Sequence, residues 1–189
     1  MDAQSLEKIL KKIQQGDLSV SDAMDQLKYF SYDDIGHTKI DDHREYRTGY
    51  PEVIYCSGKT PVQVKEIFEA MQEKDVNIIA TRANKETYEV VSRAIPEAEY
   101  HEMARIITLK KKEISYVKTS ISIVSAGTSD MPVAEEAGVS AEFFGNPVKR
   151  FYDVGVAGIH RLQKNIEEIN KARVIVVIAG MEGALPSVV

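Results

Sequence analysis

The stretch Ile121-Ser122-Ile123-Val124-Ser125-Ala126-Gly127-Thr128-Ser129-Asp130 decides the fold. Its first five residues are mostly apolar and β-branched, which predicts a buried strand. The small residues that follow predict a tight turn. A helix is expected from Pro132 to Ala137, because proline favours the first turn of a helix. A buried strand followed by a tight turn and a helix is typical of α/β proteins, so we expect this fold class.

The rest of residues 119–189 continues this pattern. Residues 159–172 predict a helix, and residues 173–179 predict a continuous apolar strand. Apolar strands without alternation indicate a sheet covered on both faces, so we expect a three-layer domain with a parallel sheet. Residues 180–189 resemble the turn after a strand and the start of a helix. Since about three strands would leave an apolar edge bare, we expect this domain to be incomplete at its C-terminal side, with further chain or another subunit completing the sheet.

Residues 1–118 predict an N-terminal α/β module with a helical hairpin. Apolar residues from Leu6 to Ile13 recur at helical spacing, Gly16 ends this helix, and Ser21 suits the N-cap of a second helix. The second helix is not basic, so we expect the hairpin to serve in dimerisation or docking rather than in reading DNA. Further along, the pattern predicts strands at 53–55 and 76–80, helices at 61–71 and 86–94, and a hairpin near Lys111 followed by a strand at 113–117.

The composition is that of an ordinary globular protein, with 43% of the 189 residues hydrophobic and 28% charged. The net charge of −5 argues against a nucleic-acid-binding protein. We expect the basic run Lys110–Lys112 to be a solvated hairpin tip. We also expect neither a membrane span nor a signal peptide. A single cysteine, Cys56, asks for no oxidising compartment, so the protein is expected to be cytoplasmic.

A small-residue turn follows the strand at 121–125. Gly127, Thr128 and Ser129 suit a phosphate or carboxylate, because small residues let backbone N–H groups approach a ligand at a helix start. Asp130 is a candidate for orienting a donor or holding a metal ion. The same residues would also serve as a helix cap without any ligand, and this alternative stays open.

Two further clusters follow later strands. Residues 153–161 contain His160, a candidate acid or base, and Arg161, which suits phosphate or carboxylate; a structural role for the histidine is the alternative. In Gly180-Met181-Glu182-Gly183, the carboxylate of Glu182 is a candidate base or Mg²⁺ ligand, or alternatively a solvated group favoured by a helix dipole. Because open α/β sheets bind ligands at the carboxyl ends of their strands, we expect the three clusters to form one pocket.

The segment from Phe30 to Gly58 has no clean period and contains the polar run Asp42-His43-Arg44. A loop with such side chains can aim them at a ligand, which favours a functional segment. A solvated connector is the alternative.

The order of these clusters resembles the PurE fold of aminoimidazole ribonucleotide carboxylase. Ser129-Asp130 match its Ser-Asp turn and His160-Arg161 match its His-Arg helix start, whereas its histidine before Leu-Pro is Ala184 here. That difference, together with the N-terminal half that the carboxylase lacks, favours the LarB family. The stretches similar to LarB are, in chain order, Arg47-Thr48-Gly49-Tyr50-Pro51-Glu52-Val53-Ile54, Gly58-Lys59-Thr60-Pro61, Ala80-Thr81-Arg82-Ala83, Gly127-Thr128-Ser129-Asp130, Asp153-Val154-Gly155-Val156-Ala157-Gly158 and Gly180-Met181-Glu182-Gly183-Ala184-Leu185-Pro186.

The resemblance implies a pyridinium-3,5-biscarboxylic acid mononucleotide synthase. Such an enzyme carboxylates the pyridinium ring of nicotinic acid adenine dinucleotide with CO₂ or bicarbonate and hydrolyses its phosphoanhydride, releasing AMP. This is the first step towards the nickel-pincer nucleotide cofactor of lactate racemase. The resemblance further implies Mg²⁺, no organic cofactor, and a homo-octamer or smaller homo-oligomer. The attacking cysteine of the family lies beyond the position of Val189, so Cys56 is not expected to be the nucleophile and this chain is expected to release no AMP.

The expected catalytic residues are Asp130, His160 and Glu182, the last also as a metal ligand. The residues expected to bind the dinucleotide are Gly127, Thr128, Ser129, Arg161, Gly180 and Gly183, with Arg44, Arg47 and Arg82 from the N-terminal module. Neither nucleic acid nor membrane is an expected partner. Two other functions stay open: an enzyme like aminoimidazole ribonucleotide carboxylase, and a nucleotide-binding module without catalysis.

Overall fold

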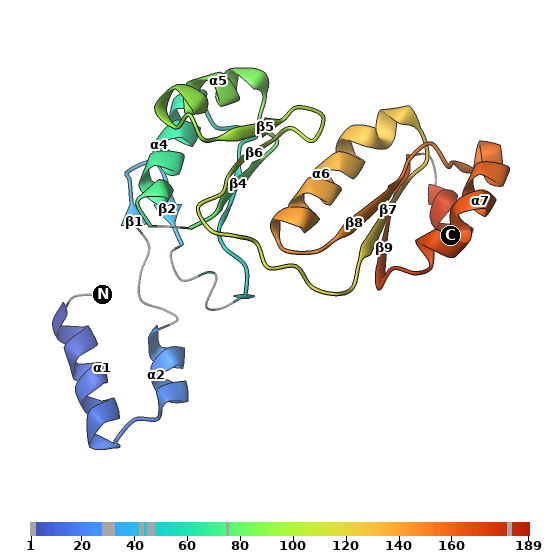
Figure 1. Cartoon of the computed structure of the whole chain (residues 1–189). Coiled ribbons are helices and arrows are strands. Elements are labelled where there is room, and N and C mark those ends of the chain that lie inside the picture. Colours follow the sequence, from blue (N-terminus) through green and yellow to red (C-terminus); the bar gives the residue numbers. More distant parts are fainter. Residues whose placement is uncertain (1–2, 28–32, 42–43, 45–47, 75, 181–182) are drawn as a thin grey trace. The chain divides into compact units, whose positions relative to one another are not determined.

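The computed structural model describes residues 3–27, 33–41, 44, 48–74, 76–180 and 183–189 (Figure 1). The chain forms two compact units, Met1–Glu52 and Val53–Val189. Helices alternate with parallel strands in the second unit, which confirms the predicted α/β class. The predicted domain boundary between residues 118 and 119 lies inside this second unit, between two sheets, and stays a prediction. None of the described helices is long and apolar enough to cross a membrane.

The first unit contains a helical hairpin and a two-stranded ribbon. Its elements are α1 (Ala3–Gln15), α2 (Val20–Leu27) and the antiparallel strands β1 (Asp33–Asp34) and β2 (Lys39–Ile40). The predicted N-cap at Ser21 is wrong, because helix α2 starts earlier. Ser19 caps it instead, since its hydroxyl accepts a hydrogen bond from the backbone N–H of Asp22 at 3.0 Å.

The second unit begins with a four-stranded sheet in the order β3-β4-β6-β5. Its elements are β3 (Val53–Tyr55), α4 (Pro61–Gln72), β4 (Ile78–Thr81), α5 (Lys85–Ala94), β5 (Glu99–His101) and β6 (Ile106–Leu109). Strands β3 and β4 are parallel, whereas β6 is antiparallel to both β4 and β5. Pro61 takes the first turn of α4, as predicted, and Thr60 caps this helix through the backbone N–H of Gln63.

The predicted strand at 113–117 and the hairpin near Lys111 are wrong. Strands β5 and β6 form the hairpin of this sheet, and residues 113–117 are irregular. The side chain of Asn77 explains the difference, because its Oδ1 accepts the backbone N–H groups of Lys111 and Lys112 at 2.7 and 2.8 Å. These bonds hold the backbone where the expected hairpin would turn, and the N–H of Val117 donates to the carbonyl of Gly145 at 2.9 Å rather than to a strand.

A three-stranded parallel sheet in the order β8-β7-β9 forms the rest of the second unit. Its elements, with short 3₁₀ helices written η, are β7 (Ile121–Ser125), η1 (Thr128–Asp130), α6 (Met131–Phe143), β8 (Val148–Phe151), η2 (Val156–Gly158), α7 (Ile159–Ile169), β9 (Val174–Ile178) and η4 (Leu185–Ser187). Helix α6 continues past its predicted end at Ala137, because Phe143 in its last turn packs into a buried apolar cluster.

Helices α6 and α7 cover opposite faces of this sheet, which confirms the three-layer arrangement (Figure 1). On one face, Val124 packs with Leu162 and Ile169 of α7. Successive residues of a strand point to opposite faces, so Ile123 and Ser125 face α6.

Helix α6 also contacts the first sheet of this unit. Phe143 packs with Ile79 and Ile106 of strands β4 and β6. Towards the other end of the helix, Glu136 binds Arg82, with 2.7 Å between Oε1 and Nε. Helix α6 therefore joins the two sheets, and its N-terminal turn leads directly into the polar cluster after β7.

Candidate ligand-binding site

The carboxyl ends of β7 and β8 are tied together by backbone hydrogen bonds. The N–H of Val154 donates to the carbonyl of Ser125 at 3.1 Å, and the N–H of Gly155 donates to the carbonyl of Ala126 at 2.9 Å. A side chain at Gly155 would place its Cβ 2.9 Å from that same carbonyl oxygen. Glycine is therefore needed for this approach. The clusters after β7 and β8 thus lie side by side, as predicted from the parallel strands.

The turn after β7 is closed by Asp130. Its Oδ2 accepts the backbone N–H of Gly127 at 2.9 Å, and its own N–H donates to the carbonyl of Gly127 at 3.1 Å. The carboxylate therefore closes the turn but makes no capping bond to helix α6, and its catalytic role stays a prediction. Thr128 and Ser129 are exposed at the tip of the turn, where their hydroxyls can reach a ligand.

The guanidinium of Arg161 is held at the same edge by Asp153. Nη1 of Arg161 pairs with Oδ2 of Asp153, and both side chains are about half exposed. A Cβ at Gly158 would lie 2.6 Å from Nε of Arg161, so the glycine leaves room for the guanidinium. Arg161 is thereby fixed in place while keeping donors for an anion.

Asp153 is a site residue that the sequence interpretation missed. Its φ of 56° is rare for a residue other than glycine, although aspartate tolerates it better than most. The glycines of the segment 153–158 drew attention to the turn, and the aspartate at its start could have been recognised as a partner for an arginine. Asp153 and Arg161 are eight residues apart in the sequence, and only the conformation of the turn between them brings their side chains together.

Only some of the other predicted site residues lie within the described part of the chain. His160 is exposed beside Arg161, and Gly180 is exposed after β9. Gly183 has a φ of 65°. Glu182 and Arg47 lie outside the described residues, as do Asp42 and His43 of the polar loop.

The two remaining predicted arginines already have carboxylate partners. Arg44 belongs to the first unit, where Nη1 lies 4.0 Å from Oε2 of Glu52. Arg82 follows β4 with a φ of 56°, and its bond to Glu136 raises the pKa of the guanidinium. Neither arginine belongs to the segments after β7 and β8, so both assignments stay predictions.

Cys56 does not have the environment of a nucleophile. The residue is buried at the end of β3, and burial raises the pKa of its thiol to about 11, although the charge of Lys59 opposes the shift. At neutral pH the thiol is therefore protonated, whereas the attacking species in such chemistry is the thiolate.

The described residues do not by themselves make a magnesium site. No group of three histidine, cysteine, aspartate or glutamate side chains gathers in the part of the chain that the structure describes. Asp130 and Asp153 at the strand edge are engaged with Gly127 and Arg161. The predicted metal ion stays a prediction that depends on Glu182.

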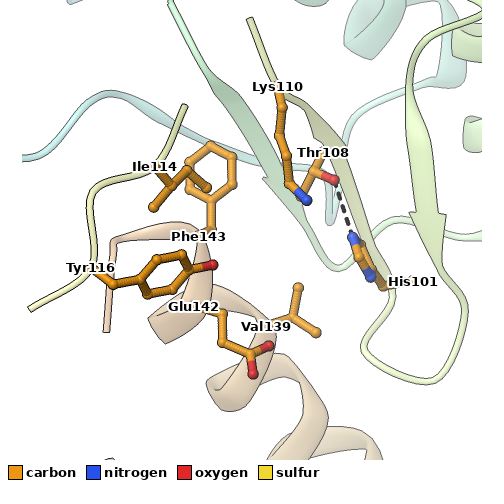
Figure 2. Close-up of a pocket in the computed structure, with 8 residues that line it drawn as sticks. All are labelled: His101, Thr108, Lys110, Ile114, Tyr116, Val139, Glu142 and Phe143. Atoms are coloured by element: carbon orange, nitrogen blue, oxygen red, sulfur yellow. Dashed lines mark hydrogen bonds between the residues drawn. The ribbon is translucent and has the colours of Figure 1, made fainter. Parts of the chain in front are cut away.

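A cavity of about 110 Å³ lies elsewhere in the second unit, between β5, β6 and the last turns of α6 (Figure 2). His101 Nε2 is 3.0 Å from the hydroxyl of Thr108 at its wall. Glu142, also in the wall, binds both terminal nitrogens of Arg150 at 2.6 and 2.7 Å. The sequence did not single out any of these residues, because they come from distant segments. The full lining is His101, Thr108, Lys110, Ile114, Tyr116, Val139, Glu142 and Phe143.

Replacing His101 by glutamine is expected to reduce the loss of stability in acid. Burial is the main cause that lowers the pKa of His101 below its ordinary value of 6.5, so the folded protein takes up the proton less readily than the unfolded chain. Stability is therefore lost as the pH falls through 6.5 towards the lowered pKa. The charged groups that modify this shift are Glu99, Lys110, Glu142 and Glu135.

Urea unfolding at about pH 7.5 and about pH 5.5 measures this effect, because these values bracket the ordinary titration of histidine. His101→Gln should show a smaller loss between the two than the wild type. His160→Gln, at an exposed position, is the matched control and should keep the wild-type loss. An unchanged loss in His101→Gln would show that other groups set the acid response.

Comparison with known proteins identifies the family of the chain. Residues 32–112 match the family model of the LarB/PurE-like N-terminal domain. Over 197 aligned positions the chain is 36% identical to the uncharacterized protein MJ0165 of Methanocaldococcus jannaschii; the alignment covers 98% of this chain and 76% of that protein. The sequence identity over most of both chains, together with the match to the domain model, shows that the chain belongs to the LarB family.

Proposed function

We propose that this protein serves the carboxylation of the pyridinium ring of nicotinic acid adenine dinucleotide, with hydrolysis of the phosphoanhydride and release of AMP. Membership of a LarB/PurE-like family supports a carboxylase-type enzyme in general. The observation that carries the finer proposal is the guanidinium of Arg161, held by Asp153 beside the Gly127–Asp130 turn. A fixed cation and exposed hydroxyls at the carboxyl edge of a parallel sheet suit the anionic groups of a dinucleotide.

The proposed reaction needs a thiolate. Its sulfur adds to the electron-poor pyridinium ring, and the resulting enamine-like carbon forms a C–C bond to CO₂. Loss of the proton from that carbon and expulsion of the thiolate restore the aromatic ring. Water then cleaves the phosphoanhydride to give AMP, a step for which Mg²⁺ would supply charge stabilisation. In this scheme the residues at the strand edge bind and orient the dinucleotide.

Titration calorimetry with nicotinic acid adenine dinucleotide tests the binding step. We expect the 189-residue protein to bind it, and to bind the nicotinamide dinucleotide more weakly, because the amide lacks the carboxylate that Arg161 or the turn would receive. Equal affinity for both dinucleotides would show that the protein does not recognise the pyridine carboxylate. Absence of binding to either would contradict the proposed function.

A turnover assay tests the role of the thiol. The sequence contains one cysteine, Cys56, whose thiol is buried with a pKa of about 11. We therefore expect a protein of these 189 residues to bind the dinucleotide without releasing AMP. Steady AMP release that is lost in Cys56→Ser would show that Cys56 is the nucleophile after all.

A binding function without catalysis is the second candidate, because it needs the strand-edge residues and no thiol. A homo-octamer or smaller homo-oligomer is part of the same proposal, and light scattering coupled to size exclusion measures it directly. Supply of a cysteine-containing LarB chain in a mixed assay distinguishes the two candidates. AMP release above that of the added chain alone would favour a role in catalysis, and release equal to it would favour the binding module.

A further inference from the structure

The hydroxyl of Ser125 lacks a hydrogen-bond partner. Ser125 is fully buried at 0% exposure, and its Oγ is the only buried side-chain nitrogen or oxygen without a partner among the residues that the structure describes. A buried polar group without a partner lowers stability, so its presence asks for an explanation. The coincidence of this position with the strand edge indicates a role in the site.

Ser122 on the same strand provides the contrast. It is equally buried at 0% exposure, but its Oγ donates to the carbonyl of Ile169 in α7 at 3.1 Å. Since the two serines lie three residues apart on one strand, they face opposite sides of the sheet. Ser122 therefore has an ordinary structural role on the α7 side, and Ser125 faces the helix that follows the Gly127–Asp130 turn.

The backbone around Ser125 is fixed. Its carbonyl accepts the N–H of Val154 at 3.1 Å, and the next N–H, of Ala126, donates to the carbonyl of Ile178 at 3.0 Å. The backbone at Ser125 is thus held by β9 and by the segment that follows β8. By contrast, the hydrogen bonds of the adjoining turn, between Gly127 and Asp130, are internal to it.

We propose, resting on the function proposed above, that the Ser125 hydroxyl is a ligand-binding group of the strand-edge site. It donates a hydrogen bond to an oxygen atom of the carboxylate or phosphate that the Gly127–Asp130 turn and Arg161 receive. Because the hydroxyl is covered, this contact requires the turn to shift when the anion binds. The protein thus holds an unsatisfied donor in its core that becomes satisfied in the complex.

The test compares Ser125→Ala with Ser122→Ala, two variants of the same chemistry on one strand. Thermal unfolding is measured without ligand, and binding of nicotinic acid adenine dinucleotide and of inorganic phosphate is measured by calorimetry. Ser125→Ala should raise the melting temperature or leave it unchanged, while weakening binding by about tenfold or more. Ser122→Ala should lower the melting temperature and leave affinity unchanged.

Two results would overturn the inference. One is a lower melting temperature for Ser125→Ala, which would show that the hydroxyl stabilises the fold. The other is wild-type affinity of Ser125→Ala for both probes. The function proposed above fails separately, if the wild type does not bind the dinucleotide. In that case phosphate binding still decides whether Ser125 serves an anion site, and a wild type that binds neither probe overturns both proposals.

Discussion

Replacing Arg161 by glutamine is expected to weaken binding of nicotinic acid adenine dinucleotide by about tenfold to a hundredfold. Hydrogen bonds to charged groups contribute about 1.5–3 kcal/mol, which corresponds to that range of affinity. The guanidinium is half exposed and is held by Asp153 at the carboxyl edge of the sheet, so its loss removes the fixed cation of the site. Calorimetric titration of both proteins measures the difference.

Arg173→Gln is the matched control for this substitution. Arg173 is exposed and immediately precedes β9, so it lies at the opposite edge of the same sheet. Its replacement changes the net charge equally and should leave affinity near that of the wild type. Equal weakening in both variants would show a general effect of charge and would contradict a site at Arg161.

Asp153→Asn should weaken binding less than Arg161→Gln, because the guanidinium remains but loses the carboxylate that holds it.

Gly145→Ala is expected to lower the free energy of unfolding by about 3 kcal/mol or more. Two costs combine at this position. The φ of Gly145 is 78°, which an alanine adopts only with strain, and the added Cβ would lie 2.4 Å from the carbonyl oxygen of Ser115. Because Gly145 also accepts the N–H of Val117 at 2.9 Å, the substitution would displace the connector between the two sheets from the end of α6.

Gly58→Ala separates the two costs. Gly58 has a similar φ of 83°, but a Cβ there would meet nothing within 4 Å. We therefore expect this variant to lose only about 1 kcal/mol, the cost of the left-handed conformation. Chemical denaturation of both variants gives the comparison. Similar losses at the two positions would mean that the contact with Ser115 is relieved at little cost.

Much of the fold was predictable because it depends on local patterns. The structure confirms the strands predicted from the apolar runs at 121–125 and 173–179, although β9 is only partly buried. It also confirms the helix starts predicted at Pro61 and Pro132. Such signals need only neighbouring residues. The segment 113–117 shows the limit of this reasoning.

The alternation of Ile114, Tyr116 and their polar neighbours predicted a strand in that segment. In the structure both side chains line the cavity beside α6, and the backbone N–H of Val117 donates to Gly145 rather than to a strand; the preceding Lys111 and Lys112 donate to Asn77. These partners are distant in the sequence. A two-residue period alone therefore could not distinguish a strand from an irregular segment that packs against a helix.

The site was predictable in its location more than in its contacts. Parallel strands imply that the clusters after β7 and β8 share an edge, and the backbone bonds from Val154 and Gly155 confirm this. The pairing of Asp153 with Arg161 depends on the unusual φ of Asp153. That the Ser125 hydroxyl has no hydrogen-bond partner is seen only when all the groups packed around it are known. Neither property is written in local sequence.

The most direct test of the central claim is amide NMR of the 189-residue protein during titration with nicotinic acid adenine dinucleotide. The proposed function predicts that the largest shifts fall on Gly127–Asp130 and on the segment from Asp153 to Arg161, with saturation at one site. Shifts confined to the cavity wall around His101 and Thr108, or no shifts at all, would contradict a dinucleotide site at the carboxyl edge of the β8-β7-β9 sheet.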